Sequence, residues 1–373
     1  MDTQEAITSP GDLIRKLLAE RNWTQEDLAV VTGQSRQTIN YIVSGRSGLT
    51  AEMANSLAAA FGNQFSDWWQ LEGEYRQSLL QASTSEIEKR AELLQKAPIK
   101  EMQKRGWLTQ DASLETLESE LKAFFGVDDL SQDFKIPVSY KRTTTQPNLN
   151  NAEKAWVIRA TQLAAMLPAP KFQEENIEKV QKELRRLAAK SKAVHKVPEL
   201  LFDNGIRFIV IEPLTNVKID GATFWLDETK PVIAMSLRFD NIGSFWFTLL
   251  HELTHIKNKD AFSVDADIDS KVGAPLDESE RRANEAAAEC LVPQRELDSF
   301  IKRIAPFYSE VRINNLATRL NIHPGIIVGQ LQHRGEINYG SHRKLMAKIR
   351  DLTTETAFTD GWGHPTPKVQ TGR

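Results

Sequence analysis

Two histidines that lie four residues apart, with a glutamate directly after the first, are the residues in this sequence best suited to metal chemistry. They occur in the segment His251-Glu252-Leu253-Thr254-His255. In an α-helix, residues four apart share one face, so His251 and His255 can present two imidazoles to one zinc ion. Glu252 can take the proton of a water molecule that attacks a carbonyl carbon. The spacing therefore predicts a catalytic centre with one Zn²⁺ per chain and Glu252 as general base.

The alternative for these histidines is a pair on the surface of an ordinary amphipathic helix. Against it stands the apolar run at residues 245–250, Phe-Trp-Phe-Thr-Leu-Leu, which directly precedes the motif. Such a run predicts a buried helix from about residue 241 to 257. The metal interpretation is therefore preferred.

A third zinc ligand is expected from a second helix, predicted over residues 278–291, which carries four glutamates: Glu278, Glu280, Glu285 and Glu289. In thermolysin-like gluzincins, a polar residue four positions after the ligand glutamate hydrogen-bonds a ligand histidine, and Glu280 with Asn284 repeats this arrangement. We predict Glu280 as the ligand and Asn284 as the residue that orients a histidine. The next candidate ligand is Glu285. The alternative for Glu280 is a capping interaction with Asp277, three residues earlier.

His323 is a further candidate catalytic residue, because a histidine near the zinc could hydrogen-bond the oxyanion formed during peptide hydrolysis. Its place before Pro324 and Gly325 is also typical of a turn residue or helix cap, and this interpretation is slightly preferred. Spacing suggests no partner for the remaining histidines, His195, His333, His342 and His364.

The N-terminal part of the chain has the order of short helices that a helix-turn-helix requires. One helix is predicted to open at Thr24 and end at Gly33, and the next to run from Ser35 to Gly45. Five polar residues are expected to contact DNA: Gln25, Ser35, Arg36, Gln37 and Asn40. Such modules read DNA as symmetric pairs, so a homodimer is expected. The alternative is a helical bundle that makes only protein contacts, because the local charges nearly cancel.

Other segments predict the framework around these residues. Three short runs rich in Ile, Val, Phe and Trp, at residues 205–211, 221–226 and 231–237, indicate strands of one small sheet. An acidic loop is expected through Asp265, Asp267 and Asp269. Residues 314–331 are expected to pack against the second domain rather than to form another DNA-binding unit.

Composition limits the class of protein. The 373 residues are 40% hydrophobic, which is enough for two or three domains, and the net charge of -3 leaves any DNA affinity to a local surface. No apolar stretch approaches the ~20 residues needed to span a bilayer. A single cysteine, Cys290, fits a reducing compartment. We therefore expect a cytoplasmic protein without a membrane partner.

Residues 245–255 and 280–293 resemble the ImmA/IrrE family of metallopeptidases, and the resemblance extends over about residues 205–339. Residues 322–331 are similar to the tail of family members that are fused to a DNA-binding module. Arg282 departs from the pattern, because family members often have an acid there. Residues 11–77 resemble the Cro/C1-type helix-turn-helix family, with a continuation through Trp68 to Tyr75 that is similar to HigA antitoxins.

These resemblances imply an all-α N-terminal domain followed by an α+β, gluzincin-like metallopeptidase domain with a small sheet. The expected parts are a helix-turn-helix domain (residues 11–77), a helical connector (78–138), a linker (139–151), a peptidase domain (152–350) and a disordered tail (351–373).

The implied function is a transcriptional regulator of toxin-antitoxin or prophage-immunity type that binds a double-stranded DNA operator. Its zinc-dependent endopeptidase site would cleave a repressor or another partner protein. The alternative is a non-enzymatic, HigA-like antitoxin or transcription factor with a cognate toxin, in which the metal site stabilises the domain or senses zinc.

Overall fold

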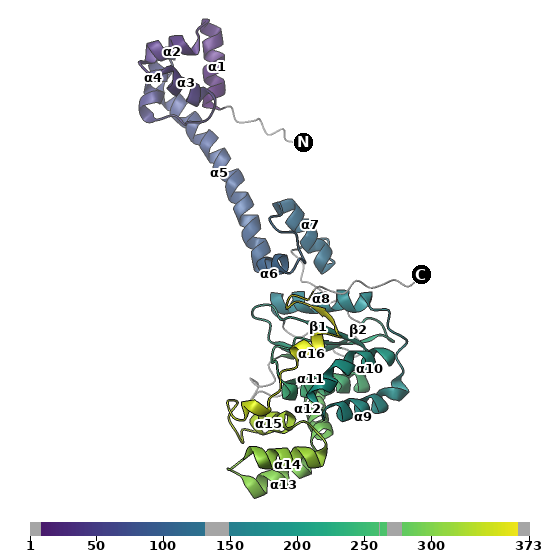
Figure 1. Cartoon of the computed structure of the whole chain (residues 1–373). Helices are drawn as coiled ribbons and strands as arrows, with labels where there is room; N and C mark the ends of the chain where they lie inside the picture. The colour runs from purple at the N-terminus through teal and green to yellow at the C-terminus, as the bar shows by residue number, and fades with distance from the viewer. Residues whose placement is uncertain (1–8, 131–148, 261, 267–277, 365–373) are drawn as a thin grey trace. The chain divides into compact units, whose positions relative to one another are not determined.

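The computed structural model describes residues 9–130, 149–260, 262–266 and 278–364. The chain forms two compact units, residues 1–94 and 95–373 (Figure 1). No helix in the described ranges is both long enough and apolar enough to cross a membrane.

The first unit is a bundle of short helices with its own apolar core. Its elements are α1 (Pro10–Arg21), α2 (Gln25–Thr32), α3 (Arg36–Val43), α4 (Ala51–Phe61) and the start of α5 (Phe65–Lys96). Thr24 and Ser35 cap α2 and α3 through their side chains, and Gly33 ends α2 with a left-handed φ of 68°. Leu28, Ile39 and Trp68 are almost fully buried between the helices. The predicted helix order is confirmed.

The second unit begins with helices that pack beside a sheet. They are α6 (Ile99–Lys104), α7 (Leu114–Phe125), α8 (Asn151–Met166), α9 (Ile177–Leu187) and α10 (Val197–Asp203). Trp107 donates from Nε1 to the Asp360 carboxylate at 3.0 Å, so the chain after α6 is attached to the end of the second unit's sheet. Most of the segment predicted as a linker, residues 139–148, lies outside the described residues, and Asn150 caps α8.

A mixed five-stranded sheet of order β4-β2-β3-β1-β5 forms the centre of this unit. The strands are β1 (Arg207–Ile211), β2 (Ile219–Trp225), β3 (Pro231–Met235), β4 (Phe262–Ala266) and β5 (Phe358–Asp360). Strand β1 runs parallel to β3 and β5, whereas β2 runs antiparallel to β3 and β4. The three predicted strand segments correspond to β1, β2 and β3.

Two predictions about this sheet were wrong. Residues 262–266 form strand β4 rather than a loop, with Asp265 opposite Gly221 of β2; Asp267 and Asp269 lie outside the described residues. Residues 351–364 were predicted as part of a disordered tail, but they include most of α16 (Arg350–Thr354) and all of β5. Pairing with β1 and bonds from distant side chains to Asp360 order β5, and a local pattern does not reveal such contacts. Residues 365–373 lie outside the described residues.

Helix α11 (Ile242–Asn258) is buried over most of its length and packs against β2, α12 (Glu278–Leu291) and α15 (Pro324–His333). Asn241 caps it, because its side chain accepts a hydrogen bond from the Ser244 amide. Between α12 and α15 the chain forms α13 (Gln294–Ile304) and α14 (Glu310–Leu320). Ile327 and Leu331 are fully buried in the same core, so residues 314–331 pack against this unit, as predicted. Helices α11 and α12 pack directly against each other.

Candidate metal centre

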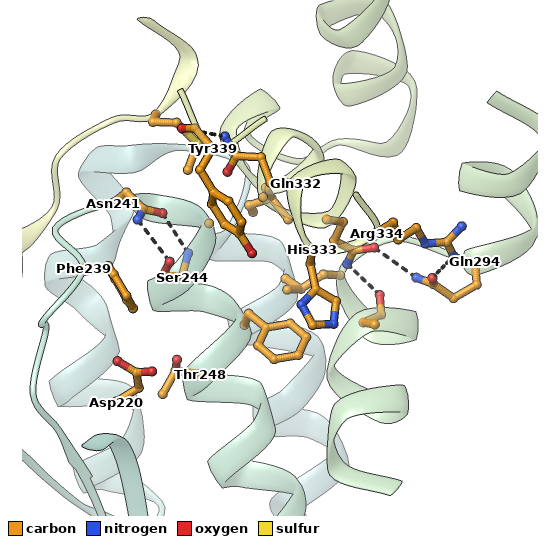
Figure 2. Close-up of a pocket in the computed structure, with 18 residues that line it drawn as sticks. Asp220, Phe239, Asn241, Ser244, Thr248, Gln294, Gln332, His333, Arg334 and Tyr339 are labelled. Carbon is orange, nitrogen blue, oxygen red and sulfur yellow. Dashed lines mark hydrogen bonds between the residues drawn. The ribbon is translucent and has the colours of Figure 1, made fainter. Parts of the chain in front are cut away.

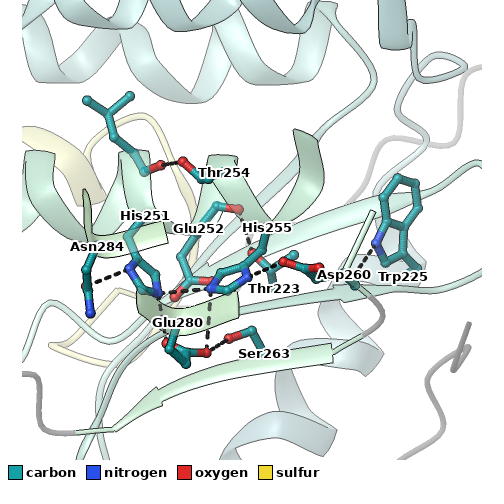
Figure 3. Close-up of polar contacts among 11 residues, drawn as sticks. Thr223, Trp225, His251, Glu252, Thr254, His255, Asp260, Ser263, Glu280 and Asn284 are labelled. Atoms are coloured by element: carbon teal, nitrogen blue, oxygen red, sulfur yellow. Dashed lines mark hydrogen bonds and ion pairs between the residues drawn. The ribbon is translucent and has the colours of Figure 1, made fainter. Parts of the chain in front are cut away.

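The three predicted metal ligands meet between α11 and α12. His251 and His255 lie one turn apart on α11, and Glu280 lies in the first turn of α12 (Figure 3). One ligand atom from each of the three lies within 4.8 Å of the others. Both histidine side chains are fully buried, and that of Glu280 is 20% exposed. The described residues therefore contain a compact group of two nitrogen donors and one oxygen donor.

Hydrogen bonds on the outer side fix the orientation of both imidazoles. The Nδ1 atom of His251 lies 3.0 Å from Oδ1 of Asn284, and that of His255 lies 2.8 Å from Oδ2 of Asp260. Because both acceptors are oxygens, each ring keeps its proton on Nδ1 and directs the Nε2 lone pair inward. The two Nε2 atoms lie 3.0 Å apart. This arrangement fits a zinc ion, which binds neutral imidazole nitrogens.

Glu280 faces both rings. Its Oε2 lies 3.3 Å from Nε2 of His251, its Oε1 lies 3.6 Å from Nε2 of His255, and Ser263 donates to Oε1 at 2.6 Å. Burial by itself would raise the pKa of Glu280, but when the two imidazoles are protonated, a hydrogen bond from His251 and the positive charges of both rings outweigh it and lower that pKa to about 2. The carboxylate is therefore ionised at neutral pH, as a metal ligand must be.

The two alternatives considered for α12 were Glu285 as the ligand and Asp277 as a capping partner of Glu280. Glu285 is largely exposed and pairs with Arg281 at 2.6 Å, outside the metal group. Asp277, considered above as a capping partner of Glu280, lies outside the described residues.

Glu252 is fully buried beside strand β2. A Cβ atom at Gly221 would lie 2.5 Å from Oε1 of Glu252, so the glycine provides the space that this carboxylate occupies. The Thr223 hydroxyl donates to the backbone carbonyl of Glu252 at 3.0 Å and joins the helix to the same strand. Glu252 is thus held next to His251 without belonging to the ligand group.

His323 forms the helix cap that its sequence position favoured. It is the N-cap of α15, and its Nδ1 accepts a hydrogen bond from the Gly325 amide at 3.1 Å. Burial lowers the pKa of its imidazole. Among the described residues, the metal group does not include His323. The cap interpretation is thus confirmed, and the oxyanion role of His323 stays a prediction.

The predicted DNA-contacting residues gather on α3 and the adjoining end of α2. Asn40 donates from Nδ2 to Oε1 of Gln25 at 3.4 Å, and Gln37 donates from Nε2 to the Tyr41 hydroxyl at 2.8 Å. Ser35 uses its hydroxyl to cap α3. The predicted DNA-contacting residues within α3 are all exposed: Arg36, Gln37 and Asn40.

Two neighbours of this group were not foreseen. Tyr41 is 39% exposed on the same helix face as Gln37, and its position four residues later was the available signal. Glu26 of α2 forms an ion pair with Arg36 at 3.2 Å.

Comparisons with known proteins agree with this division of the chain. A helix-turn-helix family model matches residues 14–68, which include all the predicted DNA-contacting residues. A model of the IrrE N-terminal-like domain, a peptidase family, matches residues 204–332, which include the metal group and Glu252. No curated protein matches the chain.

Proposed function

We propose that this chain, which joins a Cro/C1-type helix-turn-helix domain to an ImmA/IrrE-type peptidase domain, is a DNA-binding regulator with a zinc-dependent endopeptidase site. Its substrate would be a repressor or another partner protein, as in regulators of the toxin-antitoxin or prophage-immunity kind. The observation that carries the proposal is the convergence of His251, His255 and Glu280 beside the buried carboxylate of Glu252.

His251, His255 and Glu280 would hold the zinc ion. A zinc ion in such a site polarises the scissile carbonyl and makes water more acidic. Glu252 lies next to a ligand on the helix and is not a ligand itself, so its carboxylate is free to act as a base. It would accept the proton of the attacking water and deliver it to the leaving amine. Asn284 and Asp260 keep both imidazoles in the tautomer that binds metal.

The number of ligands supports an enzyme over a purely structural site. Structural zinc is usually held by four protein ligands, whereas catalytic zinc has three and leaves one position for water or substrate. The group found among the described residues has three members. A structural or zinc-sensing site also has no need of an adjacent proton acceptor, and Glu252 provides one.

The N-terminal domain would bring the peptidase to an operator. In a helix-turn-helix, the exposed start of the second helix contacts base edges in the major groove. Arg36, Gln37 and Asn40 hold that position on α3. Two copies of the chain would read a symmetric site.

The test compares wild type with Glu252→Gln, using Glu285→Gln on the exposed side of α12 as the matched control. Each zinc-loaded protein is incubated with the proteins encoded beside its gene, and cleavage is followed by mass spectrometry. Loss of the general base should lower the rate by ~10²–10⁴, with unchanged zinc content, and the control should behave as wild type. Equal cleavage, or equal regulation in cells, by wild type and Glu252→Gln would contradict the peptidase function and favour the non-enzymatic regulator.

A further inference from the structure

A cavity of about 160 Å³ lies between α11, α12 and α15, on the N-terminal side of the metal centre along α11 (Figure 2). Much of its wall consists of large apolar side chains: Phe239, Phe247, Leu291, Ile326, Tyr339 and Met346. Neither the proposed proton transfer nor the metal group uses these residues.

The cavity adjoins the metal centre on both helices. Phe247 and Thr248 line it, and they precede His251 and Glu252 by one helical turn. The Phe247 ring centroid lies 6.3 Å from that of His251, so a side chain in the cavity wall is a direct neighbour of a proposed ligand. On α12, Ala288 lines the cavity one turn after Asn284, which hydrogen-bonds His251. A peptide with its scissile bond at the metal centre could therefore insert a neighbouring side chain into the cavity.

The polar residues in the wall interact within the protein. Asp220 receives two hydrogen bonds from Arg238, at 2.9 and 3.0 Å, and Arg334 pairs with Asp298 at 2.6 Å. These two lining residues carry a full charge, and both have an ion-pair partner. The third titratable lining residue, His333, packs against Phe247, with ring centroids 6.2 Å apart. Gln330 donates to the Ala288 carbonyl and accepts from Gln294. A charged guest would therefore gain little here, whereas an apolar guest would be removed from water.

We propose that this cavity is a specificity pocket, which binds a bulky apolar side chain, such as that of Phe, Leu or Met, next to the bond that is cleaved. The proposal rests on the peptidase function proposed above and names its substrate class. The volume agrees, because an engineered apolar cavity of about 150 Å³ is large enough for benzene. The preferred substrate is then a protein with an accessible segment that carries such a residue.

The first experiment maps cleavage sites in a peptide library by mass spectrometry. Wild type should prefer Phe, Leu or Met over Ala at one position beside the cleaved bond by roughly 10- to 100-fold. Ala288→Leu adds bulk inside the cavity and should shift the preference to small residues. The matched control, Ala286→Leu, changes the same helix at a residue that does not line the cavity and should keep the wild-type preference. Met346→Ala enlarges the cavity and should improve cleavage beside Trp.

Cleavage without selectivity for apolar residues, or a preference that neither Ala288→Leu nor Met346→Ala alters, would overturn the pocket and leave the peptidase function standing. If wild type cleaves nothing, the peptidase function fails, and the pocket is tested by binding alone. For this, Glu252→Gln protein is titrated with two blocked peptides that differ only in Phe or Ala, and binding is followed by NMR. The Phe peptide should bind roughly 10- to 100-fold more tightly, and Ala288→Leu in the same background should remove the difference. Equal binding of both peptides would overturn the pocket.

Discussion

Gly221 of β2 faces Glu252 of α11 so closely that a Cβ atom on the glycine would lie 2.5 Å from the carboxylate oxygen Oε1. The strand thus determines where the proposed general base can lie. Gly221 also lies at an irregularity in the pairing of β2 with β4, and the contact that leaves no room for a side chain comes from α11.

Gly221→Ala should displace the Glu252 carboxylate and lower the peptidase rate about 10²-fold, because a shift of about 1 Å in a catalytic group can cost that much. Zinc content should stay at one per chain, since the atoms nearest to the new methyl group belong to Glu252 and Thr248 and not to a ligand. The rate and the metal content are measured together. Gly340→Ala, where a Cβ meets nothing within 4 Å, is the control. A fully active Gly221→Ala protein would argue against Glu252 as the base.

Glu280→Gln should weaken zinc binding strongly, because the ion then loses its only anionic ligand in the described group. Metal affinity is measured by competition with a chelator. Glu285→Gln, on the same helix but paired with Arg281 at the surface, should bind zinc as wild type does. Unchanged affinity in Glu280→Gln would remove this residue from the site and make Glu285 the next candidate.

Asp260→Asn should weaken zinc binding about 10- to 100-fold, because the carboxylate that accepts from Nδ1 of His255 becomes a neutral amide. The same chelator competition measures it. Asp351→Asn, an exposed position on α16, controls for the loss of one negative charge. If both variants retain wild-type affinity, Asp260 has no part in orienting the ligand.

Gln37→Ala and Asn40→Ala should each weaken binding to the cognate operator by about 1–3 kcal/mol and relax sequence preference at one base pair. Both side chains lie at the exposed start of α3. Binding is measured by fluorescence anisotropy with the full chain at fixed salt. Gln70→Ala, an exposed glutamine on α5, is the control. Intact affinity and preference in both α3 variants would show that another surface contacts the bases.

The sequence predicted the site residues whose positions depend on the spacing within a single helix. His251, Glu252 and His255 follow from helical spacing, and the pairing of Glu280 with Asn284 came from a resemblance. Asp260 was not predicted, because it lies beyond the left-handed residue Lys259 that ends α11, where helical periodicity no longer applies.

The contacts of Gly221 and Ser263 with the site could not be predicted, because they depend on the register between β2 and β4 and on how the helices pack against these strands. For His323, the local sequence favoured the cap that the structure shows. A histidine before Pro-Gly satisfies a local cap, and proximity to a metal cannot be deduced from its sequence position.

The ion pair between Glu26 and Arg36 has a consequence for how this protein would search along DNA. Both side chains are exposed, so a carboxylate accompanies the guanidinium at the start of the recognition helix. Attraction to DNA of arbitrary sequence depends on cations that displace counterions from the phosphates, and here one such cation is partly neutralised. We therefore expect Arg36 to add less than one phosphate contact to the salt dependence of affinity and little to residence on random DNA. The lifetime of the complex with the operator would then depend more on contacts with the correct base pairs than on attraction to the DNA phosphates.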